Sequence, residues 1–341
     1  MLQALRRPLV VALATLLAAG ALAGCSGSTN KPKYTYDNPT AKGSGAPAKL
    51  ETVRIGFLPL PDALPLWKAE KEGYWPTAGV YVELVPFEKD GELRQAFADG
   101  KVDGALLDLV QAVGLKAGGL DLQVTGVALG QTPAEGAMQI VSMSDKYKTA
   151  SDLKGVRIEV TKGTDEEYAA EQMLLAAGLK PEEISLAYSG SDDDRTRAML
   201  SKSLHVGLLP EKFAFIALGR GGHLISSDTQ AKRSLSQTVY AFRSERLTAK
   251  TDAINRFFQG YNWAVADTML KKEGLADLLR DNVKLSAAEA TLYPIPHFPG
   301  AAVPTKESVE AVAQWLLAKG MIKAAPAYDT VVNASVLPPI K

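Results

Sequence analysis

Short apolar segments alternate with longer amphipathic segments through the first half of this chain. The segments Val53–Phe57, Val80–Val85, Gly104–Leu107 and Leu122–Leu129 have the length and apolar content of strands. Helical periodicity follows the first three of them, at residues 63–73, 92–98 and 110–117. Regular alternation of strand and helix predicts an α/β fold, with mainly parallel sheets covered by helices.

The same alternation restarts after Gln131-Thr132-Pro133. The expected strands are 138–142, 157–161, a strand near Ile184, and 206–209; the expected helices are 164–177, 194–202 and 211–218. A strand over 236–242 then returns the chain to the first group, and helices at 251–271, 275–281 and 309–317 follow. The pattern predicts two α/β lobes, 50–135 plus 238–341 and 136–237. A two-strand hinge near 131–139 and 237–243 would join them.

The first 49 residues have a different character. Arg6 and Arg7 precede a 14-residue apolar run that ends at Leu22, which is typical of a secretory signal peptide and too short for a membrane-spanning helix of about 20 residues. Leu22-Ala23-Gly24-Cys25 resembles a bacterial lipobox. Residues 1–24 are therefore predicted to be removed and Cys25 to carry the acyl chains, including palmitate. These would anchor the protein to a cell membrane, facing the periplasm or the extracellular side. Residues 25–49, rich in Ser, Gly, Pro and Lys, are predicted to be a flexible tether. The alternative is an ordinary cleaved signal followed by a chance cysteine.

Composition excludes several classes of function. The chain has 38 basic and 38 acidic residues, one cysteine and three histidines. Removal of Arg6 and Arg7 with the signal would leave 38 − 2 = 36 basic residues against 38 acidic ones, a formal charge of −2. Such a balance shows no nucleic-acid footprint. One cysteine permits no internal disulfide and no thiol-rich zinc site, and we expect neither a metal nor a cofactor.

Several short motifs carry a family resemblance. They are Val53–Pro59 (VRIGFLP), Ala69–Trp75 (AEKEGYW), Asp99–Gly104 (DGKVDG), Asp152–Gly155 (DLKG), Leu209–Phe213 (LPEKF), Pro304-Thr305, Trp315-Leu316 and Gly320–Ile322. In this order and spacing they resemble the substrate-binding proteins of nitrate, sulfonate, taurine and thiamine-precursor ABC transporters, from about Thr52 to Leu337. The resemblance implies the bilobal periplasmic-binding-protein fold of the second type. It also implies a monomer without catalytic activity that delivers one small solute to an ABC permease and ATPase.

Two segments depart from the pattern of that group. Glu-Pro is common in the group where this chain has Pro210-Glu211-Lys212, and the preceding segment Leu204–Gly207 lacks the usual Asp-Ala pair. Both departures bear on how a ligand would be held near Glu211.

Candidate ligand-binding residues lie where the predicted strands end. In open α/β sheets ligands bind outside the carboxyl ends of the strands. The candidates are Leu60, Asp62, Leu107, Asp108, Gln131, Thr161, Gly163, Thr164, Pro210 and Glu211. Asp62 and Asp108 have an alternative role as helix caps, and Glu211 as a favourable charge at a helix N-terminus. With Asp62, Asp108 and Glu211 facing one cleft, we expect a neutral or cationic ligand.

The segment Thr161–Thr164 has two interpretations. Free backbone N–H groups at a helix N-terminus suit an anionic group such as a sulfonate or carboxylate, and the resemblance would place one here. However, the helix itself begins with Asp165, Glu166 and Glu167, which complement its dipole and repel an anion. The alternative is a helix closed by a capping box of Thr164 and Glu167.

Other patterns are expected to have a structural role and not to bind a ligand. Asp192–Asp194 lacks the spacing of a calcium loop and is expected to be a solvated loop that caps a helix from Arg195. Trp67, Tyr74 and Trp75 are expected in the core. Enzymes on the same fold remain alternatives. A thiamine-pyrimidine synthase uses a cysteine-rich segment and a reacting histidine, whereas Cys25 is the only cysteine of this chain and none of its three histidines lies in the candidate cleft loops. A lipidated export signal argues against a futalosine-pathway lyase. A ligand-sensing lipoprotein is a further alternative.

Overall fold

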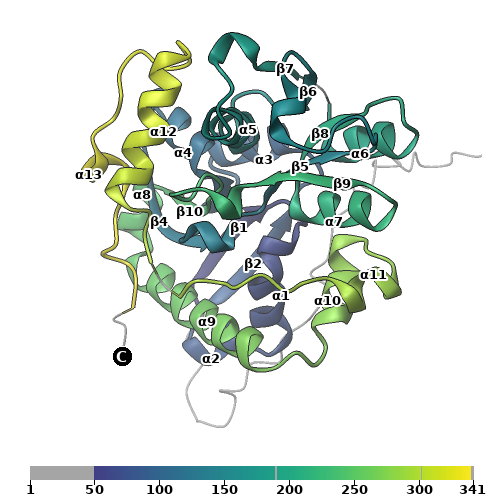
Figure 1. Cartoon of the computed structure of the whole chain (residues 1–341). Coiled ribbons are helices and arrows are strands. Elements are labelled where there is room, and N and C mark those ends of the chain that lie inside the picture. Colours follow the sequence, from purple (N-terminus) through teal and green to yellow (C-terminus); the bar gives the residue numbers. More distant parts are fainter. Residues whose placement is uncertain (1–49, 189, 301, 339–341) are drawn as a thin grey trace, which may run out of the picture. The chain divides into compact units, whose positions relative to one another are not determined.

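The computed structural model describes residues 50–188, 190–300 and 302–338 (Figure 1). Contacts divide the chain after Lys33, and every described residue belongs to the unit Tyr34–Lys341. The predicted signal peptide, the Cys25 lipidation site and the tether lie outside the described residues. Within the described part, no helix is both long and apolar enough to cross a membrane.

The first sheet has the strand order β2-β1-β3-β10-β4. Its strands are β1 (Thr52–Phe57), β2 (Tyr81–Pro86), β3 (Gly104–Asp108), β4 (Leu122–Leu129) and β10 (Thr238–Arg243). β1 runs parallel to β2 and β3, whereas β10 is antiparallel to β3 and β4. The reversed strand is the one that returns from the second half of the chain.

The second sheet has the equivalent order β7-β6-β8-β5-β9. Its strands are β5 (Met138–Ser142), β6 (Arg157–Val160), β7 (Ser185–Tyr188), β8 (Val206–Pro210) and β9 (His223–Ser227). β6 is parallel to β7 and β8, and β5 is antiparallel to β8 and β9. In this sheet too, the antiparallel strand is the one next to a crossing: β5 is the first strand after the chain leaves the first sheet. The α/β class with two mainly parallel sheets is therefore confirmed.

Two crossings connect the sheets. The first runs from β4 to β5 through a short 3-10 turn, η2 (Pro133–Glu135), and the second from β9 to β10 through η5 (Asp228–Gln230). The sequence placed the second crossing at 237–243, which is wrong because those residues pair within the first sheet. The strand β9 had not been predicted, since its side chains are largely solvent-accessible and its two serines give a weak apolar signal.

The crossings are packed directly against each other. Gly130 has φ +83°, and a Cβ atom there would lie 2.0 Å from the carbonyl oxygen of Ser236, so only glycine fits this position. The Nε2 of Gln237 donates to the carbonyl oxygen of Gly130 at 2.8 Å. Buried Asp228 joins both segments, because its Oδ2 accepts from Ser236 Oγ at 2.5 Å and its Oδ1 from the Met138 N–H at 3.1 Å.

Helices cover both faces of the first sheet. On one face, Leu106 of β3 belongs to the core that it shares with α1 (Leu64–Lys71), α2 (Tyr74–Ala78) and α9 (Thr251–Leu270). On the other face, its neighbours Ala105 and Leu107 belong to the core beneath α3 (Asp90–Ala98). This alternation follows from the two-residue period of a strand. Trp67 and Trp75 are buried as expected, and the indole of Trp75 stacks on Phe257 at 5.8 Å.

Another core links α4 (Leu109–Ala117) with α5 (Asp165–Ala176) and α12 (Lys306–Ala318). The rings of Tyr168 and Trp315 meet edge to face at 5.4 Å, so α12 packs against a helix of the second sheet. The remaining helices are α6 (Asp192–Leu200), α7 (Glu211–Gly219), α8 (Ser244–Ala249), α10 (Leu275–Val283), α11 (Ala287–Leu292) and α13 (Tyr328–Val331); short 3-10 turns are η1 (Pro61–Ala63), η3 (Ala150–Leu153) and η4 (Pro181–Glu183).

Candidate functional site

Asp62 lies in the 3-10 turn η1, directly after β1. The N-cap residues of η1 and α1 are Leu60 and Ala63, and neither helix has a side-chain cap. The alternative that Asp62 serves as a helix cap is therefore wrong. Its Oδ1 is buried and has no hydrogen-bond partner among the described residues. Leu60, two residues earlier, packs against the apolar cluster that includes Leu209 and Phe213 of the second sheet and its helix α7.

Two buried tyrosines accompany Asp62. Tyr240 lies on β10 and Tyr261 on α9, and their rings meet edge to face at 5.1 Å. Both hydroxyl groups are buried without a hydrogen-bond partner among the described residues. Burial raises the pKa of Asp62 to about 6, and the hydroxyl of Thr238 limits the rise. Burial also raises the pKa of both tyrosines. Their hydroxyl groups are close enough to act on each other, which raises the pKa of Tyr240 and lowers that of Tyr261, and the charge of Asp62 raises both.

Glu211 opens α7, at the end of β8. Phe215 lies four residues later on the same helical face, and its ring contacts that of Tyr293 at 5.3 Å. The Tyr293 hydroxyl is buried, and no hydrogen bond of normal geometry reaches it among the described residues. It is nevertheless close enough to Glu211 to lower the pKa of that carboxyl. Burial raises the pKa of Glu211 to about 7, against this moderating effect of Tyr293.

Both carboxylates act on the hydroxyl of Tyr293. Its pKa is raised mainly by burial, and also by the charges of Glu211 and Asp62. Asp62 follows a strand of the first sheet and Glu211 follows a strand of the second. We call Asp62, Glu211, Tyr240, Tyr261 and Tyr293 the carboxyl–phenol cluster.

Asp108 ends β3 and caps α4. Its Oδ1 accepts from the backbone N–H of Gln111 at 2.7 Å, so the capping role is confirmed. Burial raises the pKa of Asp108, the bond from Gln111 lowers it, and the charges of Asp90 and Glu166 raise it further. The side chain of Leu107 points into the core beneath α3. Contact of either residue with a ligand stays a prediction.

The loop before α5 is closed by the chain's own glutamates. The backbone N–H of Thr161 donates to Glu166 Oε2 at 2.8 Å, and that of Gly163 to Glu167 Oε2 at 2.9 Å. Thr164 is the N-cap as expected, but Glu167 bonds to Gly163 instead of Thr164, so the predicted capping box is not formed. Two of the N–H groups considered for an anionic ligand, those of Thr161 and Gly163, are thus already occupied by carboxylates.

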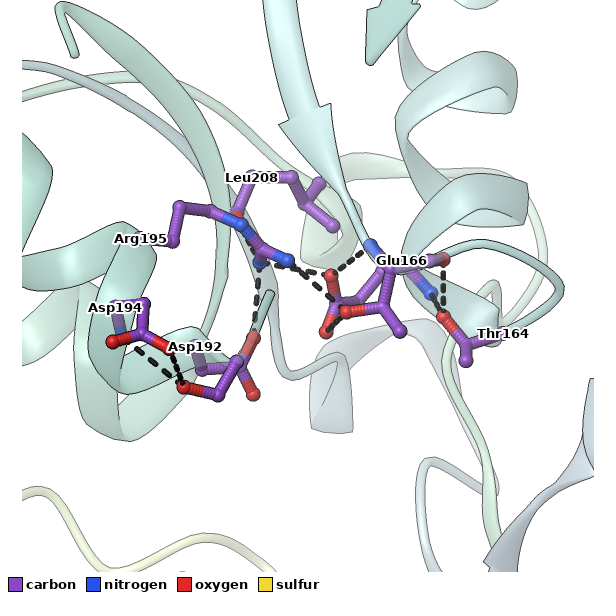
Figure 2. A network of polar contacts seen from close by, with 8 residues as sticks. Thr164, Glu166, Asp192, Asp194, Arg195 and Leu208 are labelled. Carbon is purple, nitrogen blue, oxygen red and sulfur yellow. Dashed lines mark hydrogen bonds and ion pairs between the residues drawn. The ribbon is translucent and has the colours of Figure 1, made fainter. Parts of the chain in front are cut away.

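Beside this loop lies a buried arginine that sequence reasoning did not single out as a site residue (Figure 2). The side chain of Arg195 is fully buried and forms ion pairs with Glu166 Oε2 at 2.8 Å and Asp192 Oδ1 at 3.0 Å. Its guanidinium also donates to the carbonyl oxygen of Leu208 at 2.8 Å and to Thr161 Oγ1 at 3.0 Å. The prediction of a solvated loop at 192–194 is wrong, because α6 already begins at Asp192. The carboxylate of Asp192 lies against Arg195.

Carboxylates of both sheets meet near this network. Burial is the main cause that raises the pKa of Asp165, followed by the charges of Asp108 and Glu166. Asp108 belongs to the first sheet, whereas Asp165 and Glu166 belong to α5 on the second. Among the residues that the structure describes, neither Asp108 nor Asp165 has an ion pair. The junction between the sheets is therefore rich in buried carboxyl groups whose neutral form is favoured.

The remaining predicted residues lie at the crossings. The backbone N–H of Gln131 donates to Glu135 Oε2 at 2.8 Å, while its side-chain Oε1 is buried without a partner among the described residues. Pro210 ends β8 opposite Met138 of β5. A hollow of about 270 Å³ between α9 and residues 295–297 contains none of the predicted site residues.

Sequence reasoning missed Tyr240, Tyr261 and Tyr293. Tyr240 stood inside a predicted strand, where an aromatic residue normally signals core packing. Tyr261 stood inside a predicted helix for the same reason. Tyr293 precedes Pro294-Ile295-Pro296, a rigid segment whose position could have marked it as a candidate.

The comparisons with known proteins identify the family of this chain and its fold. The model of the NMT1/THI5-like family matches residues 60–273, which is more than half of the chain. The chain belongs to the NMT1/THI5-like family. No match was found among curated proteins.

Solved structures show the periplasmic-binding-protein fold. The ligand-binding component of an ABC-type import system from Staphylococcus aureus, with zinc bound, has a TM-score of 0.70 at 17% identity, over 84% of this chain and 97% of that one. The aliphatic sulphonate-binding protein SsuA from Escherichia coli has a TM-score of 0.70 at 19% identity, over 85% and 94%. The desulfurization enzyme DSZB has a TM-score of 0.64 at 12% identity, over 84% and 97%.

These neighbours include both binding proteins and an enzyme, so the fold by itself does not decide between the two. In the described residues of this NMT1/THI5-like chain, no group of three or more His, Cys, Asp or Glu side chains could hold a metal ion.

Proposed function

We propose that the protein is the solute-binding component of an ABC importer and that it traps a small organic solute between two closing lobes. The lobes are 50–135 plus 238–341 and 136–237. The observation that carries the proposal is the carboxyl–phenol cluster, in which Asp62 Oδ1 and three tyrosine hydroxyls are buried without a partner of normal geometry among the described residues, and Glu211 of the second sheet acts on Tyr293. Buried polar groups are nearly always paired, so these atoms favour a partner that enters from outside.

The two crossings support closure. Each consists of one short segment, and they contact each other at Gly130 and Gln237. Hinges of a few residues between two domains are a common basis for closure around a ligand. Binding proteins of ABC importers share the fold, as in the Staphylococcus aureus and Escherichia coli neighbours. By this analogy the partners of this chain are a permease and an ATPase, and it acts as a monomer without a cofactor.

An enzyme is the second candidate. The pKa values of Asp62 and Glu211, about 6 and about 7, suit proton transfer near neutral pH, and DSZB shares the fold. We favour binding because the carboxyl–phenol cluster contains no nucleophilic Ser or Cys and no His. A sensor that contacts a receptor would be distinguished by the absence of neighbouring permease and ATPase genes.

A solute that binds in this site is expected to raise the midpoint of thermal unfolding. At 100 times its dissociation constant a ligand stabilises the folded protein by about 2.7 kcal/mol, a shift of roughly 5 °C. The measurement is a thermal-shift screen of sulfonates, amines, thiamine pyrimidines and nucleobases, followed by product analysis of every hit. Absence of any shift would contradict solute binding, and conversion of a hit would establish the enzyme instead.

The lipid anchor at Cys25 is tested by substitution. Cys25→Ala removes the only thiol of the chain, so we expect loss of acyl-chain labelling, with release from the membrane fraction or blocked maturation. Metabolic labelling with a palmitate analogue and cell fractionation measure both effects, and Ser26→Ala is the matched control. A Cys25→Ala protein that matures and stays with the membrane would show that the anchor is elsewhere.

A further inference from the structure

We infer that a latch between α7 and the segment 286–297 keeps the two lobes closed, and that the lobes stay joined at α12 and α5 when this latch opens. The segment belongs to the first lobe (50–135 plus 238–341) and α7 to the second (136–237), and Figure 1 shows α7 beside α11. The inference rests on the proposed trapping of a solute between the lobes and adds the contact that controls closure. The latch consists of Phe215, Ile216, Arg220, Glu289 and Tyr293.

The side chains of the latch contact each other directly. The rings of Phe215 and Tyr293 meet edge to face, with 5.3 Å between their centroids, which is a favourable arrangement of two aromatic rings. Phe215 and Ile216 also pack against the core of the first lobe. Arg220 Nη2 donates to Glu289 Oε1 at 3.4 Å. α7 therefore contacts the other lobe through two apolar side chains and one ion pair.

The latch opens without leaving a buried charge unpaired. The side chain of Arg220 is 63% exposed, so water replaces Glu289 when the pair breaks. Glu289 keeps its bond within α11, because the backbone N–H of Ser286 donates to its Oε2 at 3.0 Å. An exposed ion pair contributes little to stability, and Phe215 and Ile216 are only half-buried. Separation of the two sides therefore requires little free energy.

The segment 286–297 is fixed to the first lobe independently of α7. Ala290 and Phe298 are buried in the core of that lobe. Further along, the carbonyl oxygen of Ala302 accepts from the backbone N–H of Val127 on β4 at 2.7 Å. When the latch opens, the segment therefore stays in place and α7 moves away with the second lobe.

The contact between α12 and α5 has the opposite character. The indole of Trp315 meets the ring of Tyr168 and donates to Glu171 Oε2 at 3.0 Å, and Lys319 Nζ pairs with the same oxygen at 2.6 Å. The apolar core around these helices continues to β4, β5 and β10, the strands that flank the crossings. A large apolar interface opposes relative motion of two domains, so we expect this side to remain joined.

Distances between paired spin labels test the latch by double electron–electron resonance, without any solute. Cys25→Ala first removes the only native thiol. One pair, Glu88→Cys with Leu224→Cys, spans the latch, because Glu88 pairs with the residue that follows α10 and Leu224 lies on β9, the strand after α7. The other pair, Ala176→Cys with Glu310→Cys, spans the contact of α5 with α12. All four labelled positions are exposed.

Phe215→Ala combined with Arg220→Ala removes the ring contact and the ion pair of the latch. We expect it to raise the ratio of open to closed molecules, measured with the first label pair, at least fivefold and to leave the second distance unchanged. Arg220→Glu places a second negative charge beside Glu289 at an exposed position. It should shift the first distance in the same direction, and it tests the latch even where the double variant does not fold.

The matched control is Trp263→Ala combined with Arg197→Ala. It removes an aromatic contact and an exposed ion pair that each lie within one lobe, so both label distances should stay as in the wild type. Thermal unfolding and circular dichroism check that each variant is folded. An unchanged first distance in the folded latch variants, or an equal change in both label pairs, would overturn the inference.

The outcomes also separate the latch from the proposed function, because the distance measurement needs no solute. If the latch variants open and the solute screen finds no ligand, the latch stands and the proposed function fails. If a solute binds to the wild type and the folded latch variants do not open, solute binding stands and the latch is wrong.

Discussion

Arg195→Met is expected to lower the free energy of unfolding by about 3–5 kcal/mol, the cost of leaving buried charges without their partner. The fully buried guanidinium pairs with Glu166 and Asp192 and donates to the carbonyl oxygen of Leu208. Methionine has a similar length but supplies neither the charge nor the donors. The two carboxylates would then have to be protonated or hydrated inside the second sheet. Urea unfolding followed by circular dichroism measures the change.

A matched control lies two residues away. Arg197 is on the same helix, but 70% of its side chain is exposed in its pair with Asp194. Arg197→Met should change stability by no more than about 0.5 kcal/mol, as is usual for exposed surface sites. Adding Glu166→Gln and Asp192→Asn to Arg195→Met should restore much of the loss. Equal effects of the two arginine substitutions would show that the buried network is not important for stability.

The ligand-free protein is expected to become more stable as the pH falls from 8 to 5. Burial raises the pKa of Asp62 and Asp228 to about 6 and that of Glu211 to about 7, in each case above the unfolded value. The folded state therefore binds more protons than the unfolded state in this range, and acidification favours it. The three groups together amount to about 2–5 kcal/mol between these pH values.

The trend should reverse in stronger acid. Desolvation is the largest single effect on Asp267 and raises its pKa, but the ion pairs with Lys68 and Lys271 and the bond from Tyr74 together outweigh it and lower the pKa to about 2. A carboxyl with a lowered pKa loses its stabilising effect as the pH falls from its unfolded value towards 2. Stability is therefore expected to be highest at about pH 4–5, from the crossing of these two ranges.

Urea unfolding at a series of pH values measures this profile. Glu211→Gln should reduce the slope between pH 8 and pH 6, because it removes the group with the highest of the three values. Glu182→Gln should leave the slope unchanged. A stability that falls steadily from pH 8 to pH 5 would contradict the burial of these carboxyl groups.

The sequence predicted the elements of the fold well because they depend on local pattern. The apolar content of Val53–Phe57 predicts a strand, and Gly178 predicts the end of the helix α5. Neither prediction needs knowledge of the rest of the chain. The division into two groups of strands was also visible, since a strand and helix rhythm that stops and restarts needs no tertiary information. The boundary of the second crossing was misplaced because β9 is largely exposed and carries a weak apolar signal.

The site was predictable only in part. Strand ends marked Asp62 and Glu211 as candidates, because ligands of open α/β sheets bind outside the carboxyl ends of the strands, and their contact with a ligand stays a prediction. The sequence could not distinguish a cap from a free carboxylate, because that depends on the direction of the side chain. Asp108 accepts a bond from Gln111, whereas Asp62 has a buried Oδ1 without a partner among the described residues.

By itself, then, the sequence determined the α/β class, the order of the elements, the motifs that resemble solute-binding proteins and the candidate strand ends. These depend on residues that are close along the chain. Only the tertiary structure decided which charges are neutralised, since Arg195 meets Glu166 across 29 positions and Tyr293 approaches Glu211 across 82. Burial and pairing depend on contacts between distant segments, and local periodicity contains no information about them.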